Sequence, residues 1–175
     1  MNMLEILNNK SLKAIEKRTQ IINAFVENTV SFKEVTSICK SLNDKQIAII
    51  LEAIEEITNK ELIQVDADYL LFAEGYILSD DNSCKREASR IVGNLAKRFP
   101  DQLNTSIKSL LINTNNESTV VRWGSAYALS RIIVLPQFAS TDLFNEISII
   151  CDKEQENGVK NQYLKSLKKA SKLRG

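Results

Sequence analysis

Apolar and small residues recur along the chain in a spacing that predicts a series of amphipathic helices. In each copy they fall at positions i, i+1, i+3, i+4 and i+7, which form one stripe along an α-helix. The copy that begins at Lys85 recurs 37 positions later from Arg122 and a further 38 positions later from Lys160. Another copy begins at Ile47, 38 positions before Lys85, and a weaker one begins at Arg18. The pattern therefore indicates internal repeats of one helical unit.

A second helix is expected between successive copies. These second helices are predicted at about 31–42, 66–79, 101–113 and 141–152. Pro100 and Pro136 fall where a first helix turns into the second, and proline fits there because it suits the first turn of a helix. Good N-cap residues precede the first helices; they are Asp44, Asp81 or Asn82, and Asn116.

The length of 175 residues fits a single domain. We expect an all-α domain of about nine helices, arranged as four antiparallel pairs with a C-terminal capping helix. The predicted repeats are 11–42, 44–79, 82–114 and 117–153, and the capping helix is 157–173. Small residues within the stripes, such as Ala53, Gly93 and Ala128, would let neighbouring helices approach closely.

The repeat pattern resembles the HEAT-like (armadillo/HEAT) family of α-solenoids over nearly the whole chain. The matching features are the period of 37–38 residues, the Asp or Asn before a first helix, the proline in the turn, and a basic residue at Lys85, Arg122 and Lys160. The resemblance implies a right-handed α-α superhelix whose second helices line the concave face. It also implies a scaffold that binds other macromolecules.

Composition and charge narrow the class of protein further. Five glycines and two prolines favour long helices over a turn-rich β fold. The net charge of +1 produces no overall field that attracts nucleic acid or membrane. No apolar run approaches the ~18 residues of a membrane span, and the first residues lack the layout of a signal peptide. We expect a soluble, cytoplasmic protein with no membrane partner.

Several residue arrangements that common catalytic and metal sites need are missing from the sequence. The chain contains no histidine, which removes the commonest general base and metal ligand. Because no Cys-x-x-Cys spacing occurs and the glycines are scattered, we predict no catalytic residue, no metal and no cofactor. Cys39, Cys84 and Cys151 continue apolar stripes and are expected to be buried thiols. The alternative is a redox-active Cys84, since Lys85 and Arg86 stand beside it.

Two groups of side chains have both a structural and a functional interpretation. The acidic residues between Glu52 and Asp81 form either a solvated surface, which we expect, or paired carboxylates that bind a cation. Trp123, Tyr127 and Arg131 are spaced by four residues, so they share a helix face on which Arg131 can stack on Tyr127. The two aromatic rings either fill the groove between repeats or join Arg131 in a partner-binding surface.

Acidic residues outnumber basic ones on the predicted second helices. The acids are Glu34, Asp66, Asp68, Glu74, Asp101, Asp142, Glu146 and Asp152, and the bases are Lys33, Lys40 and Lys108. An acidic concave face disfavours DNA in the groove, because it repels phosphate. We predict a non-enzymatic scaffold for a basic protein or peptide, with Asp68, Asp142 and Glu146 selecting the partner.

The last predicted helix is strongly basic. Four lysines follow the spacing i, i+3, i+4 and i+7, and they are Lys165, Lys168, Lys169 and Lys172. This patch is either a polar cap that keeps the end of the solenoid in solution or a site for nucleic acid. Nucleic-acid binding through basic convex and C-terminal helices is therefore the alternative function. It includes a distant role like that of the HEAT-like DNA alkylation-repair glycosylases.

Overall fold

Five long helices dominate the computed structural model, which describes residues 2–174 of the chain. They are α2 (Ala14–Val26), α4 (Asp44–Asn59), α6 (Asn82–Leu95), α8 (Thr119–Ile133) and α11 (Asn157–Ser171). Each has a buried apolar side, which in α6 includes Ala88, Ile91 and Val92. Residues 2–174 contain no strand, so the all-α prediction is confirmed.

Shorter helices precede the first long helix or connect the long ones. They are α1 (Met3–Asn8), α3 (Phe32–Cys39), α5 (Ala67–Glu74), the 3₁₀ turn η1 (Pro100–Gln102), α7 (Asn104–Asn113), α9 (Pro136–Ala139) and α10 (Leu143–Lys153). The described residues thus form eleven α-helices rather than about nine. The stripe pattern does not predict α1 and α9, because helices of 6 and 4 residues are too short to display it.

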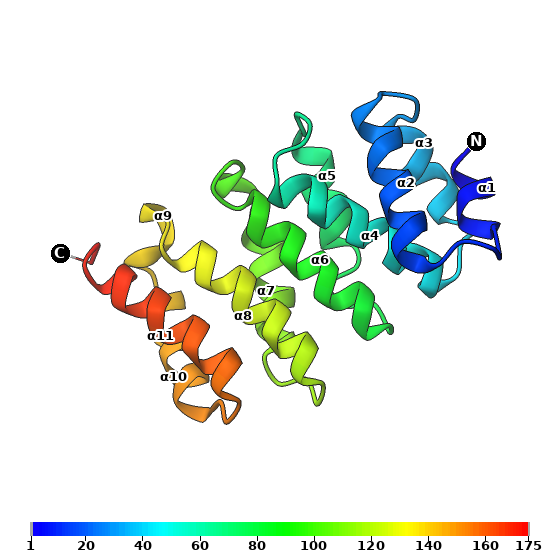
Figure 1. The fold of residues 1–175 in the computed structure, drawn as a ribbon. Coiled ribbons are helices and arrows are strands. Elements are labelled where there is room, and N and C mark those ends of the chain that lie inside the picture. Colours follow the sequence, from blue (N-terminus) through cyan, green and yellow to red (C-terminus); the bar gives the residue numbers. More distant parts are fainter. Residues whose placement is uncertain (1, 175) are drawn as a thin grey trace.

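The long helices lie side by side in chain order, α3, α5, α7 and α10 lie behind this layer, and α1 lies at its N-terminal end (Figure 1). We call the two sides the long-helix layer and the short-helix side. Helices α5, α7 and α10 pack most closely against α6, α8 and α11, respectively. In the predicted pairs, each short helix belongs with the long helix before it. In the structure, the closest neighbour of α5, α7 and α10 is instead the long helix that follows. Contacts between repeats therefore hold the stack together.

Small residues let α6 and α8 approach each other closely. A Cβ atom at Gly93 would lie 2.9 Å from Tyr127 Cδ1 and 3.0 Å from Ala128 Cα. A Cβ atom at Gly124 would lie 3.1 Å from the Cα of Arg86. Only glycine fits both positions without movement of the facing helix, as the small residues in the stripes predict.

The helix starts agree with the sequence pattern to within three residues, the largest difference being α7, which begins at Asn104 and not at 101. Asp81 is the N-cap of α6, and its carboxylate accepts a hydrogen bond from the Cys84 N–H at 2.9 Å. Asn43, not Asp44, caps α4, because its side chain and that of Gln46 exchange hydrogen bonds with each other's backbone N–H. The side chain of Asn116 lies before α8 and accepts from the Ser118 N–H, so it is not the N-cap either. Both prolines lie between a long helix and the next short one, as predicted, and each begins a short helical segment there, η1 and α9, which was not predicted.

One apolar core runs along the whole stack, from Met3 in α1 to Ala170 in α11. Its fully buried members include Leu51, Ile91 and Leu129, one from each of three successive long helices. None of the helices in residues 2–174 combines the length and the apolar character that crossing a membrane requires.

Candidate functional site

Charged side chains of α2, α4 and α6 meet on the long-helix layer in a set of ion pairs that we call the arginine–glutamate network. Its members are Arg18, Glu52, Glu55, Glu56, Arg86, Glu87 and Arg90. Arg86 Nε lies 2.6 Å from Glu87 Oε1, and Arg90 Nη2 lies 3.0 Å from Glu55 Oε1. The network therefore links three successive repeats.

Two carboxylates of this network are withdrawn from water. Glu87 is 2% exposed and Glu55 is 6% exposed, and Arg90 contacts both of them. Burial raises the pKa of Glu55, because it favours the neutral acid, whereas Arg90 acts in the opposite direction. The interpretation of Glu55 as part of a solvated acidic surface is thus wrong, since α6 covers it with an arginine.

The spacing of the charges explains how the network forms. Arg86 and Arg90 are one turn apart on α6, and Glu52 and Glu56 are one turn apart on α4. Glu52 and Arg90 also hold the same place in successive copies of the 38-residue repeat. These two residues do not pair with each other, since Glu52 meets Arg86 and Arg90 meets Glu55, but their opposite charges at equivalent positions were a visible signal that the facing sides of α4 and α6 are complementary.

Hydrogen bonds extend the network to the aromatic residues of α8. Asn94 Nδ2 donates to Glu55 Oε1 at 3.2 Å, and Tyr127 Oη donates to Asn94 Oδ1 at 2.5 Å. The guanidinium carbon of Arg131 lies 3.4 Å from the centre of the Tyr127 ring, so the expected stacking is present. Trp123 stands next to Tyr127, with ring centres 5.6 Å apart.

The two aromatic side chains are packed to different degrees. Tyr127 is 7% exposed and lies against Gly93, so it fills the groove between α6 and α8. Trp123 is half-buried, and Arg131 is exposed. Of this predicted partner-binding group, Arg131 and part of Trp123 are therefore accessible to a ligand, whereas Tyr127 is mainly structural.

Two hollows flank these residues on the long-helix layer. One, of about 430 Å³, is lined by the arginine–glutamate network together with Asn59 and Lys60. The other, of about 320 Å³, lies between α4, α6 and α8, and its lining includes Glu61, Lys97 and Arg131. The sequence pattern places the binding site on the second helices and does not predict either hollow.

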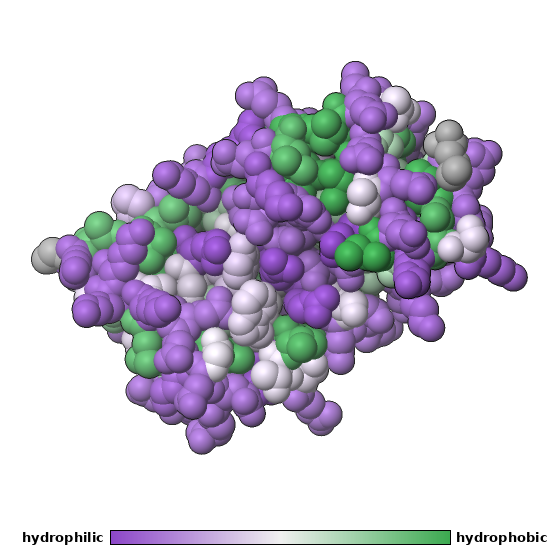
Figure 2. Space-filling view, viewed as in Figure 1, coloured by the Kyte–Doolittle hydropathy of each residue, from purple (hydrophilic) through white to green (hydrophobic). Residues whose placement is uncertain are grey.

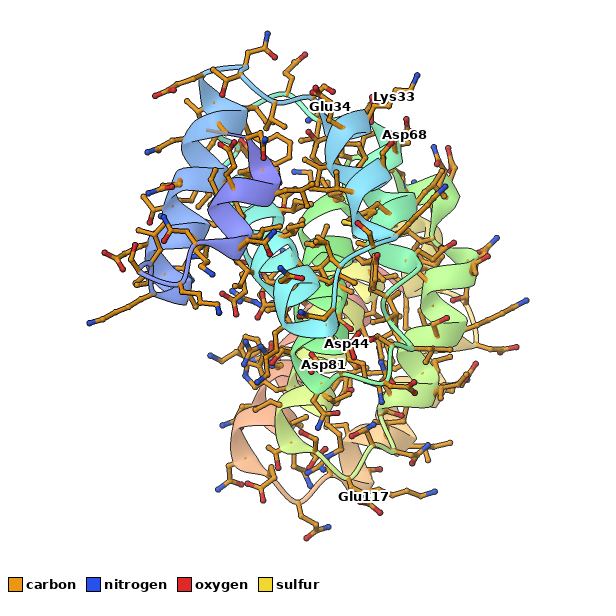
Figure 3. The ribbon with its side chains drawn as sticks, turned by 90° about the vertical axis from the view of Figure 1, so that its right-hand side faces the viewer. Lys33, Glu34, Asp44, Asp68, Asp81 and Glu117 are labelled. Atoms are coloured by element: carbon orange, nitrogen blue, oxygen red, sulfur yellow. The ribbon has the colours of Figure 1, made fainter. Side chains whose placement is uncertain are left out.

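The predicted acidic binding residues lie on the short-helix side but do not form one cluster. Asp68 is in the first turn of α5, whereas Asp142 and Glu146 are one turn apart at the start of α10. Helices α5 and α10 belong to different levels of the stack (Figure 1). In Figure 3 Asp68 lies at the same end of the molecule as Glu34 of α3. All three predicted acids are exposed, and none forms an ion pair within residues 2–174.

The predicted basic patch is exposed on α11. Its four lysines, Lys165, Lys168, Lys169 and Lys172, form no ion pair in the described part of the chain. Arg174 differs from them, because its guanidinium packs over Phe144 and donates to the Ala139 carbonyl at 2.9 Å. The lysines are thus free to contact a ligand, whereas Arg174 attaches the end of the chain to α9 and α10.

The cysteines are buried, as predicted. Burial, together with the nearby Asp81 and Asp44, raises the pKa of Cys84 to about 12. The environment therefore opposes the thiolate that Lys85 and Arg86 suggest in the sequence. Residues 2–174 contain no group of three or more Cys, Asp and Glu side chains placed to hold a metal ion.

Comparison of the chain with protein-family models, with curated proteins and with solved structures finds no match.

Proposed function

We propose that the chain is a non-enzymatic scaffold with a HEAT-like solenoid architecture, and that it binds a basic protein or peptide on its short-helix side. The serial packing of the long helices and the 37–38-residue period support the architecture. The three free thiols, Cys39, Cys84 and Cys151, fit a reducing compartment such as the cytoplasm.

The observation that carries the proposal is the different environment of the acids on the two sides. On the long-helix layer, Glu52, Glu55 and Glu87 all meet arginines. On the short-helix side, Asp142 and Glu146 are exposed and have no ion-pair partner in residues 2–174. Acids without internal partners are available to attract a basic ligand, and complementary charge selects partners and speeds association.

The proposal depends on these exposed acids and not on a concave groove. Successive long helices pack directly against one another, whereas the short helices contact mainly the long helices. The short-helix side, which the resemblance to HEAT-like proteins makes the concave face, is therefore proposed as an open surface. Figure 3 shows α3 and α5 on one side of the long helices, with Lys33, Glu34 and Asp68 at their outer end.

Charge reversal tests the partner side. The double variant Asp142→Lys/Glu146→Lys should lose a basic protein that the wild-type chain captures from lysate, as measured by quantitative mass spectrometry. The matched control is Glu27→Lys/Asp80→Lys, which makes the same change in net charge at two exposed positions outside the short helices. Equal capture by the wild-type chain and the α10 double variant would refute the acidic binding side.

A further inference from the structure

The outer surface of α6, α8 and α11 is basic and almost free of acids. Glu87 is the single acidic residue in these three helices, and it is buried against Arg86 and Arg90. Exposed cations on or directly after these helices have no ion-pair partner in residues 2–174; they are Lys97, Arg98, Arg131, Lys165, Lys168, Lys169 and Lys172. We call this set the basic surface.

Arg131 is the most rigidly placed cation of the basic surface. Its guanidinium is stacked on Tyr127, and Nη1 donates to the Tyr127 carbonyl at 3.3 Å. Together with Lys97 it lines the hollow of about 320 Å³, in which Glu61 is the one carboxylate among the lining residues. A guanidinium that is fixed in place and lacks a carboxylate partner is suited to bind phosphate, because little side-chain freedom is lost on binding.

The packing of α11 continues the basic surface beyond α8. Gln162 Nε2 donates to the Trp123 carbonyl at 3.3 Å and fixes how α11 lies along α8. Lys165 and Lys169 follow Gln162 on the exposed part of α11, one turn apart. Neighbouring helices are about 8–10 Å apart, so the basic surface spans on the order of 20 Å from α6 to α11.

We propose that this basic surface binds the phosphate backbone of nucleic acid. A span on the order of 20 Å corresponds to about six steps of 3.4 Å along a strand. Lysine is depleted in protein–protein interfaces, whereas phosphate contacts depend on lysine and arginine. Trp123 of α8, the helix between α6 and α11, is half-buried, so the exposed part of its ring is accessible to a base. The basic surface is separate from the acidic side of the preceding proposal.

A membrane surface fits these residues less well. A helix that lies in a membrane interface needs a broad apolar face directed outward. The apolar face of α11 is buried in the protein, through Val159, Tyr163 and Ala170. Leu164 is the one exposed large apolar residue within α11. In Figure 2 the hydrophilic colour predominates over α11, α8 is largely white with some green, and the larger green areas lie nearer the N-terminal helices.

Fluorescence anisotropy with a labelled oligonucleotide of about 20 nucleotides, single-stranded or as a duplex, measures this binding between roughly 50 and 200 mM salt. The test variant is Arg131→Gln/Lys165→Gln/Lys169→Gln. The control is Lys10→Gln/Lys40→Gln/Lys45→Gln, which removes the same charge from exposed positions outside the basic surface. The test variant should raise Kd roughly tenfold or more, and the slope of log K against log salt should fall by about 2–3, at 0.7–0.9 per lost contact.

Each other outcome contradicts the proposal. Absence of binding to both oligonucleotides at low salt would remove it. An equal loss of affinity in the control variant would assign the binding to net charge, not to this surface. Binding of poly-glutamate or of anionic vesicles as tight as that of the oligonucleotides would show that the surface does not select nucleic acid. Circular dichroism melting of each variant checks that the helices are intact.

Discussion

The ring of Tyr127 lies directly against Gly93, so closely that a Cβ atom at position 93 would stand 2.9 Å from Tyr127 Cδ1. This contact joins α6 to α8. The phenol group of the same ring then donates to Asn94, the next residue of α6. Close packing and a polar network thus meet at one point between two repeats.

Replacement of Gly93 by alanine should destabilise the protein. The added methyl group meets both the Tyr127 ring and the Cα of Ala128, so one of the two helices must shift. We expect the free energy of unfolding to fall by about 1–3 kcal/mol, measured by urea denaturation. Gly158→Ala is the control, because a Cβ atom there meets nothing within 4 Å. Equal stability of the two variants would contradict the close approach of α6 and α8.

Replacement of Arg90 by methionine should destabilise the protein, because two buried carboxylates, Glu55 and Glu87, each lose a cation that they contact. We expect the free energy of unfolding to fall by about 2–3 kcal/mol at neutral pH. This is below the range for a fully buried pair, because Arg90 keeps 24% of its side chain exposed. Lys45→Met, at an exposed site on α4, is the control and should change stability little.

The pH dependence of this variant follows from Glu55. Burial raises the pKa of Glu55 in the folded protein, and removal of Arg90 raises it further. The folded variant therefore takes up a proton before the unfolded chain does as the pH falls. The stability difference from the wild type should shrink towards acidic pH, and an unchanged difference in urea titrations at several pH values would contradict the role of Glu55.

Glu154 has a lowered pKa, in contrast to Glu55, so its ionised form stabilises the folded protein. Burial alone would raise its pKa, but the Glu156 N–H and Arg122 stabilise the carboxylate and hold the pKa below its ordinary value of 4.5. This stabilisation is present above the unfolded pKa and is lost as the pH falls through the folded pKa. Glu154→Gln should lower the free energy of unfolding by about 1–3 kcal/mol at neutral pH and leave it unchanged at strongly acidic pH, as measured by urea denaturation. The control Glu156→Gln, at an exposed site, should change it little at either pH.

The cysteines should react only after unfolding. Burial raises the pKa of Cys39 to about 11 and that of Cys84 to about 12, so neither forms a thiolate near neutral pH. Iodoacetamide labelling followed by mass spectrometry should find both unmodified in the native protein and modified in urea. An exposed cysteine introduced as Ser171→Cys is the reactive control. Rapid native labelling of Cys84 would instead support the redox alternative.

The sequence by itself determined that the chain is helical, where the long helices lie, and that small residues recur at their contacts. These properties follow from local rules, because the stripe at Lys85, Arg122 and Lys160 specifies one buried face per helix wherever that helix packs. Helix starts were predictable for the same reason. A cap such as Asp81 acts on the backbone of its own first turn.

Only the tertiary structure decided which side each charge faces and what covers it. Glu55 and Asp68 are both acidic residues of the same predicted repeat, yet α6 buries Glu55 beneath Arg90 and leaves Asp68 exposed on α5. Tyr127 and Arg131 share a helix face, but Gly93 makes room for the ring while the guanidinium reaches solvent. Such differences depend on contacts between residues more than 30 positions apart, and no local spacing records the distance between two helices.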